Sequence, residues 1–342
     1  MKTKVIILSV LAALSVVLVM MLRIYSNASR PALNGFDRAI VGELSAIGEI
    51  LNAGESSYFA GVSEKTIWLG DHRDPLKLIA LSLDDGTRSD HQIVMPNPVR
   101  ASRIMVDSAH FYLADLTLYK IYRGSTNSWA LADPIYQGTL FSEFIPLGNS
   151  SMFMRTILDN EFELIKKTQP DITIENRNVL QKQIDGLFCV DGALRYDRHM
   201  QRLVYVYFHR NEFICLDTAL QIVFRGSTID TTRLAKMRVA ELTTRHASSL
   251  ASPAYLVNRK VIVADSTLYI NSLLKGDNES APAFSNASAI DMYALSSGKY
   301  IGSFYLPYYH GKRSRHFTIV GKRLLSLHDG HLLIYSLPRL VP

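Results

Sequence analysis

Seven polar side chains in this sequence have the chemistry to bind a ligand, because Arg, Asp and Asn supply charges and hydrogen bonds for anions, metals or sugars. Each lies near the end of a short apolar run. They are Arg100, Arg103, Asp191, Arg195, Arg210, Asn211 and Asp230. We predict that they form a ligand-binding set, and the sequence assigns no catalytic residue. A structural interpretation stays open, because Asp and Asn in turns also bond neighbouring backbone amides.

Two of these residues, Arg210 and Asn211, lie at the polar centre of LVYVYFHRNEFICLD, residues 203–217. Apolar and aromatic runs flank this centre on both sides. The pattern is that of two strands joined by a turn, so the stretch is first of all a β-hairpin. Whether Arg210 and Asn211 also face a binding site is left open by the pattern.

Compact catalytic motifs are absent from the sequence. It contains no phosphate loop, dinucleotide glycine fingerprint, Gly-x-Ser-x-Gly elbow or His-Glu-x-x-His helix. Its 10 histidines show no convincing metal-ligand spacing, so we predict no metal and no cofactor. Enzymes whose sites are assembled from loops on a rigid scaffold are not excluded, because such sites carry no compact motif.

The elements that must position these residues are short strands. Past residue 35, apolar or alternating runs recur between Asp, Asn, Gly and Ser turns. Six strand–turn–strand units begin near residues 66, 111, 152, 203, 261 and 323, at a spacing of roughly 40 to 60 residues. They include FYLADLTLY (residues 111–119) and VIVADSTLY (residues 261–269), which share Ala-Asp-x-Thr-Leu-Tyr in register.

This spacing predicts an all-β fold, a six-bladed β-propeller that forms a single domain over residues 35–340. Each hairpin would supply the second and third strands of a blade, and the seven polar residues would lie around the mouth of the central channel. The last unit stops near Pro338, so we expect a strand within residues 39–50 to close the ring. A β-sandwich or two smaller β domains is the alternative.

The N-terminus predicts a membrane helix. Lys2 and Lys4 precede a charge-free apolar run from Val5 to Leu22, and Arg23 follows it. Its 18 residues are at the lower limit for spanning a bilayer, and the positive end would stay in the cytoplasm. Residues 1–30 are therefore expected to form a signal anchor, or a signal peptide, with a short linker. The rest of the chain would be extracytoplasmic, and periplasmic in a bacterium with two membranes.

The charge distribution indicates which partners to expect, and the positions of the cysteines indicate whether they form a disulfide. The formal net charge is +6, but the positive residues are spread along the chain, with one cluster at residues 310–316. Nucleic acid is therefore not the expected partner. The two cysteines, Cys189 and Cys215, would lie near the first strand and on the third strand of one blade. That separation exceeds the reach of a disulfide, so free thiols are favoured.

Three stretches carry a resemblance to a known group of proteins. They are residues 191–217 (DGALRYDRHMQRLVYVYFHRNEFICLD), 225–232 (RGSTIDTT) and 290–307 (IDMYALSSGKYIGSFYLP). In these the chain resembles uncharacterised exported six-bladed β-propeller proteins of bacteria, over most of its length after residue 35. The resemblance implies a fold and an exported location but no activity. The Trp-Asp marks of WD repeats and the Ala-x-Asp-x-x-x-Gly pattern of quinoprotein propellers are absent, so no quinone cofactor is implied.

Two functions remain compatible with the sequence. The first is a membrane-anchored, outward-facing propeller that binds or organises a ligand or another envelope protein. The second is a propeller enzyme, a hydrolase or lyase that acts on an extracytoplasmic small molecule or glycan at the channel mouth. A channel plugged by apolar side chains would favour the scaffold, whereas a close cluster of three or more of the Arg, Asp and His residues at one mouth would favour the enzyme.

Overall fold

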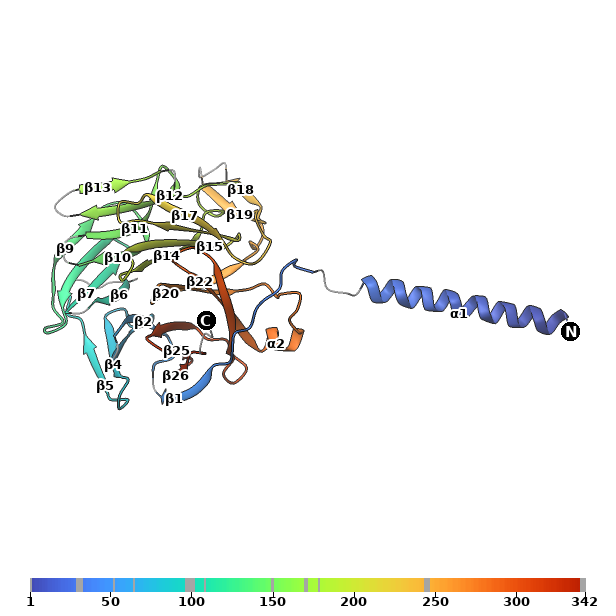
Figure 1. Ribbon diagram of the computed structural model, residues 1–342. Coiled ribbons are helices and arrows are strands. Elements are labelled where there is room, and N and C mark those ends of the chain that lie inside the picture. The colour runs from blue at the N-terminus through green and yellow to red at the C-terminus, as the bar shows by residue number, and fades with distance from the viewer. Residues whose placement is uncertain are drawn as a thin grey trace.

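The computed structural model describes residues 2–28, 33–51, 53–63, 65–95, 102–107, 109–148, 151–168, 172–177, 179–242 and 247–338. A long helix, α1 (Lys2–Ala28), precedes six four-stranded antiparallel sheets. The sheets are arranged as blades around a centre, as Figure 1 shows. The predicted all-β, six-bladed propeller is thus confirmed.

The blades follow one another along the chain. Blade 1 contains β2 (Ser57–Val62), β3 (Thr66–Asp71), β4 (Lys77–Ser82) and β5 (Arg88–Gln92). Blade 2 contains β6 (Ser102–Asp107), β7 (His110–Asp115), β8 (Lys120–Ser125) and β9 (Leu131–Gln137). Blade 3 contains β10 (Phe141–Leu147), β11 (Ser151–Leu158), β12 (Glu161–Thr168) and β13 (Ile172–Glu175). In each, the first strand along the chain is the innermost.

The second half of the ring contains one insertion. Blade 4 contains β14 (Gly192–Asp197), β15 (Arg202–Tyr207), β16 (Glu212–Leu216) and β17 (Ile222–Ser227). A hairpin of β18 (Val239–Leu242) and β19 (Ala247–Leu250) follows it. Blade 5 contains β20 (Asn258–Ala264), β21 (Thr267–Ser272), the short helix α2 (Ala281–Ser285), β22 (Ala287–Ala294) and β23 (Tyr300–Pro307). Blade 6 contains β24 (His316–Val320), β25 (Arg323–His328) and β26 (His331–Ser336), with β1 (Ser45–Leu51) as its outer strand.

The hydrophobic core is divided among the spaces between blades. Six buried clusters each join two adjacent blades, and together they include every neighbouring pair around the ring. Between blades 4 and 5, for example, Val204 and Phe213 pack with Leu268 and Tyr293. Both faces of a blade are therefore buried, which explains why the inner strands are apolar without a strict alternation. The centre of the ring is left free for other side chains.

The N-terminal strand completes the last blade. β1 pairs antiparallel with β26, with Ser45 opposite Ser336 and Leu51 opposite His331. Without β1, β26 would present an unpaired edge of backbone amides and carbonyls. The first and the last strand of the propeller, β1 and β26, lie in the same sheet, so hydrogen bonds between the two ends of the ring hold it closed.

One of the six predicted hairpins occupies a different place in its blade. Residues 261–269 belong to the first and second strands of blade 5, β20 and β21, and not to the second and third. The shared Ala-Asp-x-Thr-Leu-Tyr stretch is therefore not a structural repeat. Asp115 ends β7 and accepts hydrogen bonds from the backbone of Thr117 and Leu118, whereas Asp265 sits in a two-residue turn with positive φ. Similar turn chemistry, and not equivalent blade position, explains the match.

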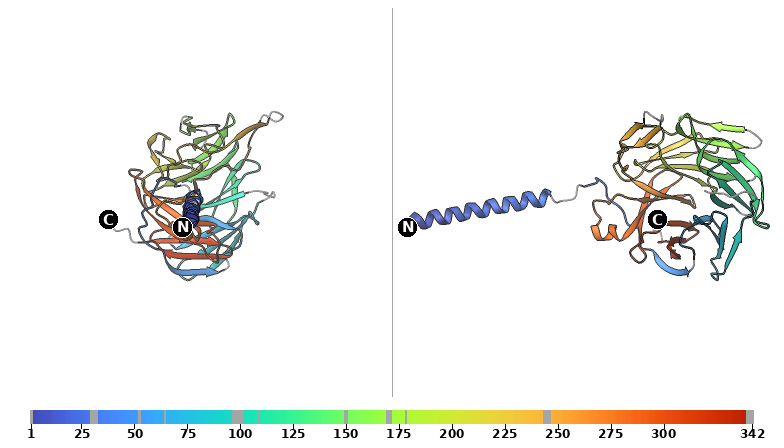
Figure 2. Two further views of the ribbon diagram at one scale, coloured as in Figure 1. Left: turned by 90° about the vertical axis from the view of Figure 1, so that its right-hand side faces the viewer. Right: turned by 180° about the vertical axis from the view of Figure 1, so that it is seen from behind.

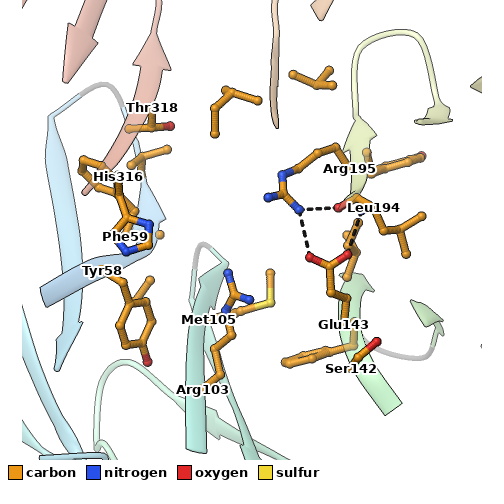
Figure 3. Close-up of a pocket in the computed structure, with 18 of the residues that line it drawn as sticks. Tyr58, Phe59, Arg103, Met105, Ser142, Glu143, Leu194, Arg195, His316 and Thr318 are labelled. Carbon is orange, nitrogen blue, oxygen red and sulfur yellow. Dashed lines mark hydrogen bonds and ion pairs between the residues drawn. The ribbon is translucent and has the colours of Figure 1, made fainter. Parts of the chain in front are cut away.

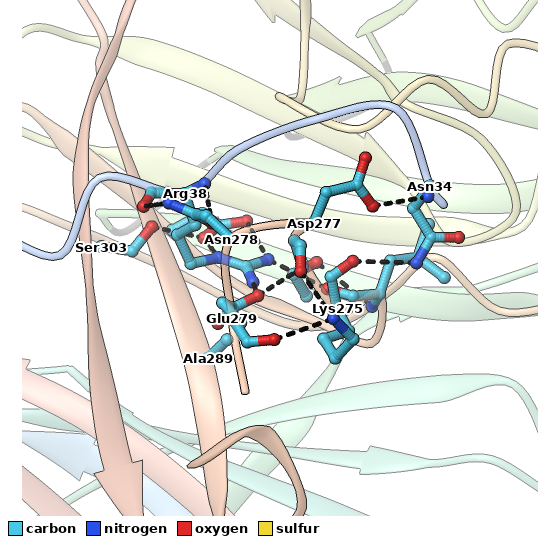
Figure 4. Close-up of polar contacts among 12 residues, drawn as sticks. Asn34, Arg38, Lys275, Asp277, Asn278, Glu279, Ala289 and Ser303 are labelled. Atoms are coloured by element: carbon cyan, nitrogen blue, oxygen red, sulfur yellow. Dashed lines mark hydrogen bonds and ion pairs between the residues drawn. The ribbon is translucent and has the colours of Figure 1, made fainter. Parts of the chain in front are cut away.

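A buried arginine fastens the segment before β1 to blade 5. The Arg38 guanidinium donates to the Glu279 carboxylate and, over 2.7 Å, to Asp291, and none of its side chain is exposed. Figure 4 shows this arrangement, with Asn34 held by Asp277 beside it. Burial opposes the charge on Arg38, but the two carboxylates outweigh it and raise the pKa of Arg38. We call Arg38, Glu279 and Asp291 the Arg38 cluster.

Helix α1 lies apart from the ring in Figures 1 and 2. Its described apolar side chains are exposed, with Val19 and Met21 each at 63%. Within the described residues, no helix is both long enough and apolar enough to cross a membrane.

Both cysteines are buried as free thiols. Cys189 precedes β14, and its sulfur lies near the backbone amides of Gln183 and Ile184. Cys215 is on β16, the third strand of the same blade, where burial raises the pKa of its thiol to about 11. A thiol with so high a pKa stays protonated near neutral pH and is a poor nucleophile.

Candidate functional site

The central channel is surrounded by the six inner strands, β2, β6, β10, β14, β20 and β24. Residues at the starts of three of them, Arg103 of β6, Lys260 of β20 and His316 of β24, line one cavity. These strands therefore begin at the same end of the channel, which we call the mouth. A fixed strand backbone holds each of these residues, so their positions do not depend on a loop.

The cavity at the mouth has a volume of about 470 Å³ and is lined mainly by positive side chains. Its basic residues are Arg103, Arg195, Arg259, Lys260 and Arg315, and we call these five the mouth cations. His316 lies among them, and no Asp or Glu belongs to the described lining. A volume of this size accommodates a small organic ligand.

A second cavity, of about 340 Å³, adjoins the first and is lined by parts of all six inner strands. The two share Arg103, Arg195 and His316. Figure 3 shows these side chains converging from different strands, with Tyr58 and Glu143 beside them. We call this space the central cavity. The channel is hollow here, so it is not the apolar plug expected of a pure scaffold.

Ion pairing differs among the mouth cations. Arg195 lies 3.4 Å from the Glu143 carboxylate, which also accepts a hydrogen bond from the backbone of Leu194. Arg315 lies 3.4 Å from Asp329, which Lys312 shares. Lys260 donates to the backbone carbonyl of Ser314. For the remaining two, Arg103 and Arg259, the described part of the chain provides no ion-pair partner.

This excess of positive charge changes the protonation of its neighbours. Burial, followed by repulsion from Arg259, Arg313 and Arg315, lowers the pKa of Lys260 to about 7. Burial and the charge of Lys260 lower the pKa of His316 to about 4, with smaller contributions from His72 and Arg103. At neutral pH, His316 is therefore uncharged and Lys260 is only partly charged. Both side chains can then accept a proton.

Two of the seven predicted residues, Arg103 and Arg195, line both cavities. Arg195 is 31% exposed although protein surrounds it, because its open surface faces the channel. Arg100 lies outside the described residues. Asp191 precedes β14 and pairs with Arg155 of blade 3 at 2.8 Å, so it joins two blades and lines neither cavity.

The other three predicted residues are buried in blade 4, and the expectation that they face the channel mouth is wrong. Arg210 is 1% exposed, pairs with Glu212 at 2.7 Å and lies over the ring of Tyr207. The Asn211 amide donates to the backbone carbonyl of Asp230, and the Asp230 carboxylate accepts from Thr228 and Thr232. These hydrogen bonds satisfy buried polar groups in the loops at the mouth end of blade 4. The structural interpretation of the hairpin at residues 203–217 therefore holds.

Four residues that line the mouth cavity were not among the predicted ligand-binding residues: Arg259, Lys260, Arg315 and His316. Three inner strands share a local pattern in which basic residues directly precede the apolar run: Ser102-Arg103-Ile104, Asn258-Arg259-Lys260-Val261 and Ser314-Arg315-His316-Phe317. This pattern could have identified the mouth. The assignment of residues 261–269 to the second and third strands concealed it, because Arg259 and Lys260 then appeared to lie away from the channel.

Metal ligation is not the chemistry that these side chains favour. In the part of the chain that the structure describes, no group of three or more His, Cys, Asp and Glu side chains is placed to hold a metal ion. Guanidinium and ammonium groups instead bind oxyanions, and Arg does so with parallel hydrogen bonds. The mouth is therefore suited to a negatively charged ligand.

Comparison with known proteins bears out the resemblance at the level of the fold. A member of the DUF4221 family from Bacteroides vulgatus is 11% identical, with a TM-score of 0.55 over 86% of this chain and 97% of that one. A catalytically inactive virginiamycin B lyase from Staphylococcus aureus, solved with quinupristin, is 10% identical, with a TM-score of 0.50 over 85% and 98%. A streptogramin B lyase is 11% identical, with a TM-score of 0.50 over 86% and 97%.

These likenesses agree with the propeller fold of this chain, and at such identities they show the fold alone. No protein-family model matches the chain, and no curated protein matches its sequence. The residues that line the channel are therefore the basis for a functional proposal.

Proposed function

We propose that this protein is a membrane-anchored, extracytoplasmic propeller that binds a ligand in the mouth of its central channel. The observation that carries the proposal is the set of mouth cations, five basic residues around one cavity whose described lining contains no carboxylate. Like charges held together without counter-charges destabilise a folded protein. A bound anion would offset that cost for Arg103 and Arg259, the two mouth cations without an ion-pair partner in the described part of the chain.

The anchor is supported by the character of α1. Its run from Val5 to Leu22 is charge-free, and Lys2 and Lys4 precede it. A helix that is apolar on all sides is stable in water only when something covers it, and the ring does not. A lipid bilayer would provide that cover for the whole run from Val5 to Leu22, although no helix of the described residues meets the length and apolarity of a membrane span by itself. The positive-inside rule would then place the ring outside the cytoplasm.

A second candidate, a lyase or hydrolase at the same mouth, is favoured by one observation. Lys260, with its pKa lowered to about 7, lies beside the cavity as a possible general base. Two of the similar solved structures are lyases by name. Binding remains the first proposal because a lowered lysine pKa is also the direct result of crowded positive charge.

Native mass spectrometry of the full chain, released from its own membranes, tests both candidates. We expect a small molecule bound to the wild type and to Arg177→Gln, which removes a distant surface charge paired with Asp159. The double variant Arg103→Gln, Arg259→Gln should lose it. A stable protein partner without any small molecule would refute the ligand site and support an envelope scaffold.

The mass of that molecule after incubation with the protein distinguishes an enzyme from a binding module. Incubation of the released ligand with fresh wild-type protein leaves its mass unchanged if the ring is a binding module. A change in mass that Lys260→Met prevents would replace the first candidate with the second.

The location is tested separately by protease treatment of intact cells with the outer membrane opened. We expect the ring to be digested while a cytoplasmic control protein survives. Carbonate washing should leave the full chain in the membrane fraction, and a chain lacking residues 1–30 should be released. Protection of the ring from protease would contradict the extracytoplasmic placement.

A further inference from the structure

Building on the ligand site proposed above, we infer that the mouth binds a phosphate-type group, a phosphomonoester or a diphosphate, whose attached apolar body extends into the central cavity. The inference deepens the proposed function by naming the ligand class. The directions of the positive charges, the two arginines without an ion-pair partner among the described residues (Arg103 and Arg259) and the lining of the adjoining cavity support this ligand class.

The mouth cations approach the cavity from several sides. Arg103 comes from β6, Arg195 from β14, and Arg259 and Lys260 from β20, while Arg315 directly precedes β24. These strands belong to four different blades. Figure 3 shows Arg103 and Arg195 on different walls of the channel. A ligand at this point meets donors from different directions and not from one face.

A phosphate group matches this distribution better than a carboxylate does. One guanidinium can bond both oxygens of a carboxylate with two parallel hydrogen bonds in a single plane. A phosphomonoester has about −1.5 to −2 charge near neutral pH and three terminal oxygens that point in different directions. It can therefore bond with cations from separate strands at once, and a diphosphate can bond with more of them.

The unpaired cations supply the charge that such a group needs. Arg103 and Arg259 are exposed at the cavity without a carboxylate partner among the described residues. Burial, and after it repulsion from Arg259, Arg313 and Arg315, lowers the pKa of Lys260, so its amine is only partly charged at neutral pH. A bound phosphate group would restore the charge of Lys260 and pair with both arginines.

The central cavity next to the mouth provides an apolar environment. Met105, Leu116, Phe141 and Phe144 contribute to its lining, and Phe317 belongs to both cavities. The charged head of a ligand would be held at the mouth while an apolar or aromatic portion lies against these side chains. A ligand with two such parts would use both cavities.

The same phosphate chemistry has two possible sources, a free metabolite or a lipid headgroup. Asn34 is bonded to Lys275 and Asp277, in the loop that follows β21. That loop opens at the mouth end, because Ser272 pairs with Asn258 at the start of β20. Only residues 29–33 separate Asn34 from α1, a span of at most roughly 20 Å. The segment that leads to α1 therefore meets the ring at its mouth end, which makes a lipid headgroup a source to be tested.

Isothermal titration of the full chain in neutral detergent micelles tests the ligand class. The probes are inorganic pyrophosphate, citrate as a polycarboxylate of comparable charge, and mixed micelles containing phosphatidic acid or phosphatidylcholine. We expect saturable binding of pyrophosphate with one site per chain. The double variant Arg103→Gln, Arg259→Gln should weaken it by about 10-fold or more, and Arg177→Gln should not.

The outcomes separate the inference from the proposed function. Citrate binding as tight as pyrophosphate binding, and lost in the same double variant, would overturn the phosphate class while leaving the channel site intact. Binding of neither probe would also overturn it, and the ligand found by native mass spectrometry would then decide whether the proposed function survives. Loss of pyrophosphate binding in Arg177→Gln to the same degree would show non-specific charge attraction and refute the site.

The lipid arm identifies the source. Binding to phosphatidic acid micelles but not to phosphatidylcholine micelles, with competition by pyrophosphate, supports a headgroup ligand at the mouth. Binding of pyrophosphate with no preference for phosphatidic acid supports a free phosphorylated ligand. Phosphatidic acid binding that is insensitive to both pyrophosphate and the double variant would contradict the mouth as its site.

Discussion

Two arginine-containing regions of this propeller show opposite electrostatic arrangements. In the Arg38 cluster one guanidinium, buried between Glu279 and Asp291, has more negative than positive charge around it. At the mouth, five cations surround a cavity whose described lining has no carboxylate. The first region is closed to solvent, and the second is open to it. A buried arginine with partners serves the fold, whereas exposed arginines without partners are available to a ligand.

The difference also appears in the neighbouring protonation states. In the Arg38 cluster the carboxylates raise the pKa of Arg38 despite its burial. At the mouth, burial and positive charge lower the pKa of Lys260 and of His316. One region therefore stabilises its positive charge with its own carboxylates, whereas at the mouth Arg103 and Arg259 have no ion-pair partner among the described residues.

The largest expected effect comes from removing the buried charge. Arg38→Met leaves Glu279 and Asp291 buried without their cation, which should lower the free energy of unfolding by about 3–5 kcal/mol. The measurement is urea unfolding, with the m-value checked for two-state behaviour. A loss below about 1 kcal/mol would show that the Arg38 cluster does not fasten the N-terminal segment.

A smaller loss is expected at Arg210, which is buried but less critically paired. Arg210→Met removes its bonds to Glu212 and to the backbone carbonyl of Gln181, but Glu212 keeps Arg225 at 2.8 Å. We expect a loss of about 2 kcal/mol, because the backbone carbonyls of Gln181 and Cys189 lose this donor while the Glu212 carboxylate keeps a cation. Pyrophosphate affinity should stay unchanged. Weaker pyrophosphate binding in this variant would return Arg210 to the list of ligand-binding residues.

The propeller itself could be predicted from the sequence, because its evidence is repeated. Strand–turn–strand units recur around the ring, and the last unit lacked a strand that β1 supplies. Each hairpin is a local pattern of alternating burial and turn residues. The position of a hairpin within its blade depends on contacts with residues far away in the sequence. For this reason the sequence placed residues 261–269 on the wrong strands of blade 5.

The site was only partly predictable because burial depends on tertiary structure. Arg103 and Arg210 look alike in sequence, since each lies at the edge of an apolar run. Arg103 opens into the channel, whereas Arg210 is enclosed by Tyr207 and Glu212, and only the packing of the blades decides between the two. Arg315 belongs to the basic cluster at residues 310–316, and only the closed ring places it at the mouth.

A pH-dependent effect should distinguish the mouth from the paired region. The pKa of Lys260 falls from an ordinary 10.5 to about 7 on folding, so the unfolded chain binds more protons between these values. Stability should therefore rise with pH from about 7 upward, by up to about 1 kcal/mol per pH unit, and fall as the pH is lowered. Lys260→Met should remove this slope, as measured by urea unfolding at pH 7, 8 and 9.

The control for that slope is a lysine with a partner. Lys182 is exposed and paired with Glu161, which raises its pKa, so Lys182→Met should leave the slope unchanged. Saturating pyrophosphate should flatten the wild-type slope, because the anion restores the proton to Lys260. A slope that persists in Lys260→Met would assign it to other groups.

The smallest expected effect on stability is at Arg103. Arg103→Gln removes an exposed cation that has no described partner, so the free energy of unfolding should change by no more than about 0.5 kcal/mol. The same substitution should reduce the rise in thermal midpoint that pyrophosphate gives the wild type, because a ligand stabilises a protein only in proportion to its binding. Arg38→Met should behave in the opposite way: its free energy of unfolding is lowered, but pyrophosphate still raises its thermal midpoint. If Arg103→Gln unfolded as easily as Arg38→Met, the cations of the mouth would be part of the fold, and their openness to a ligand would be incidental.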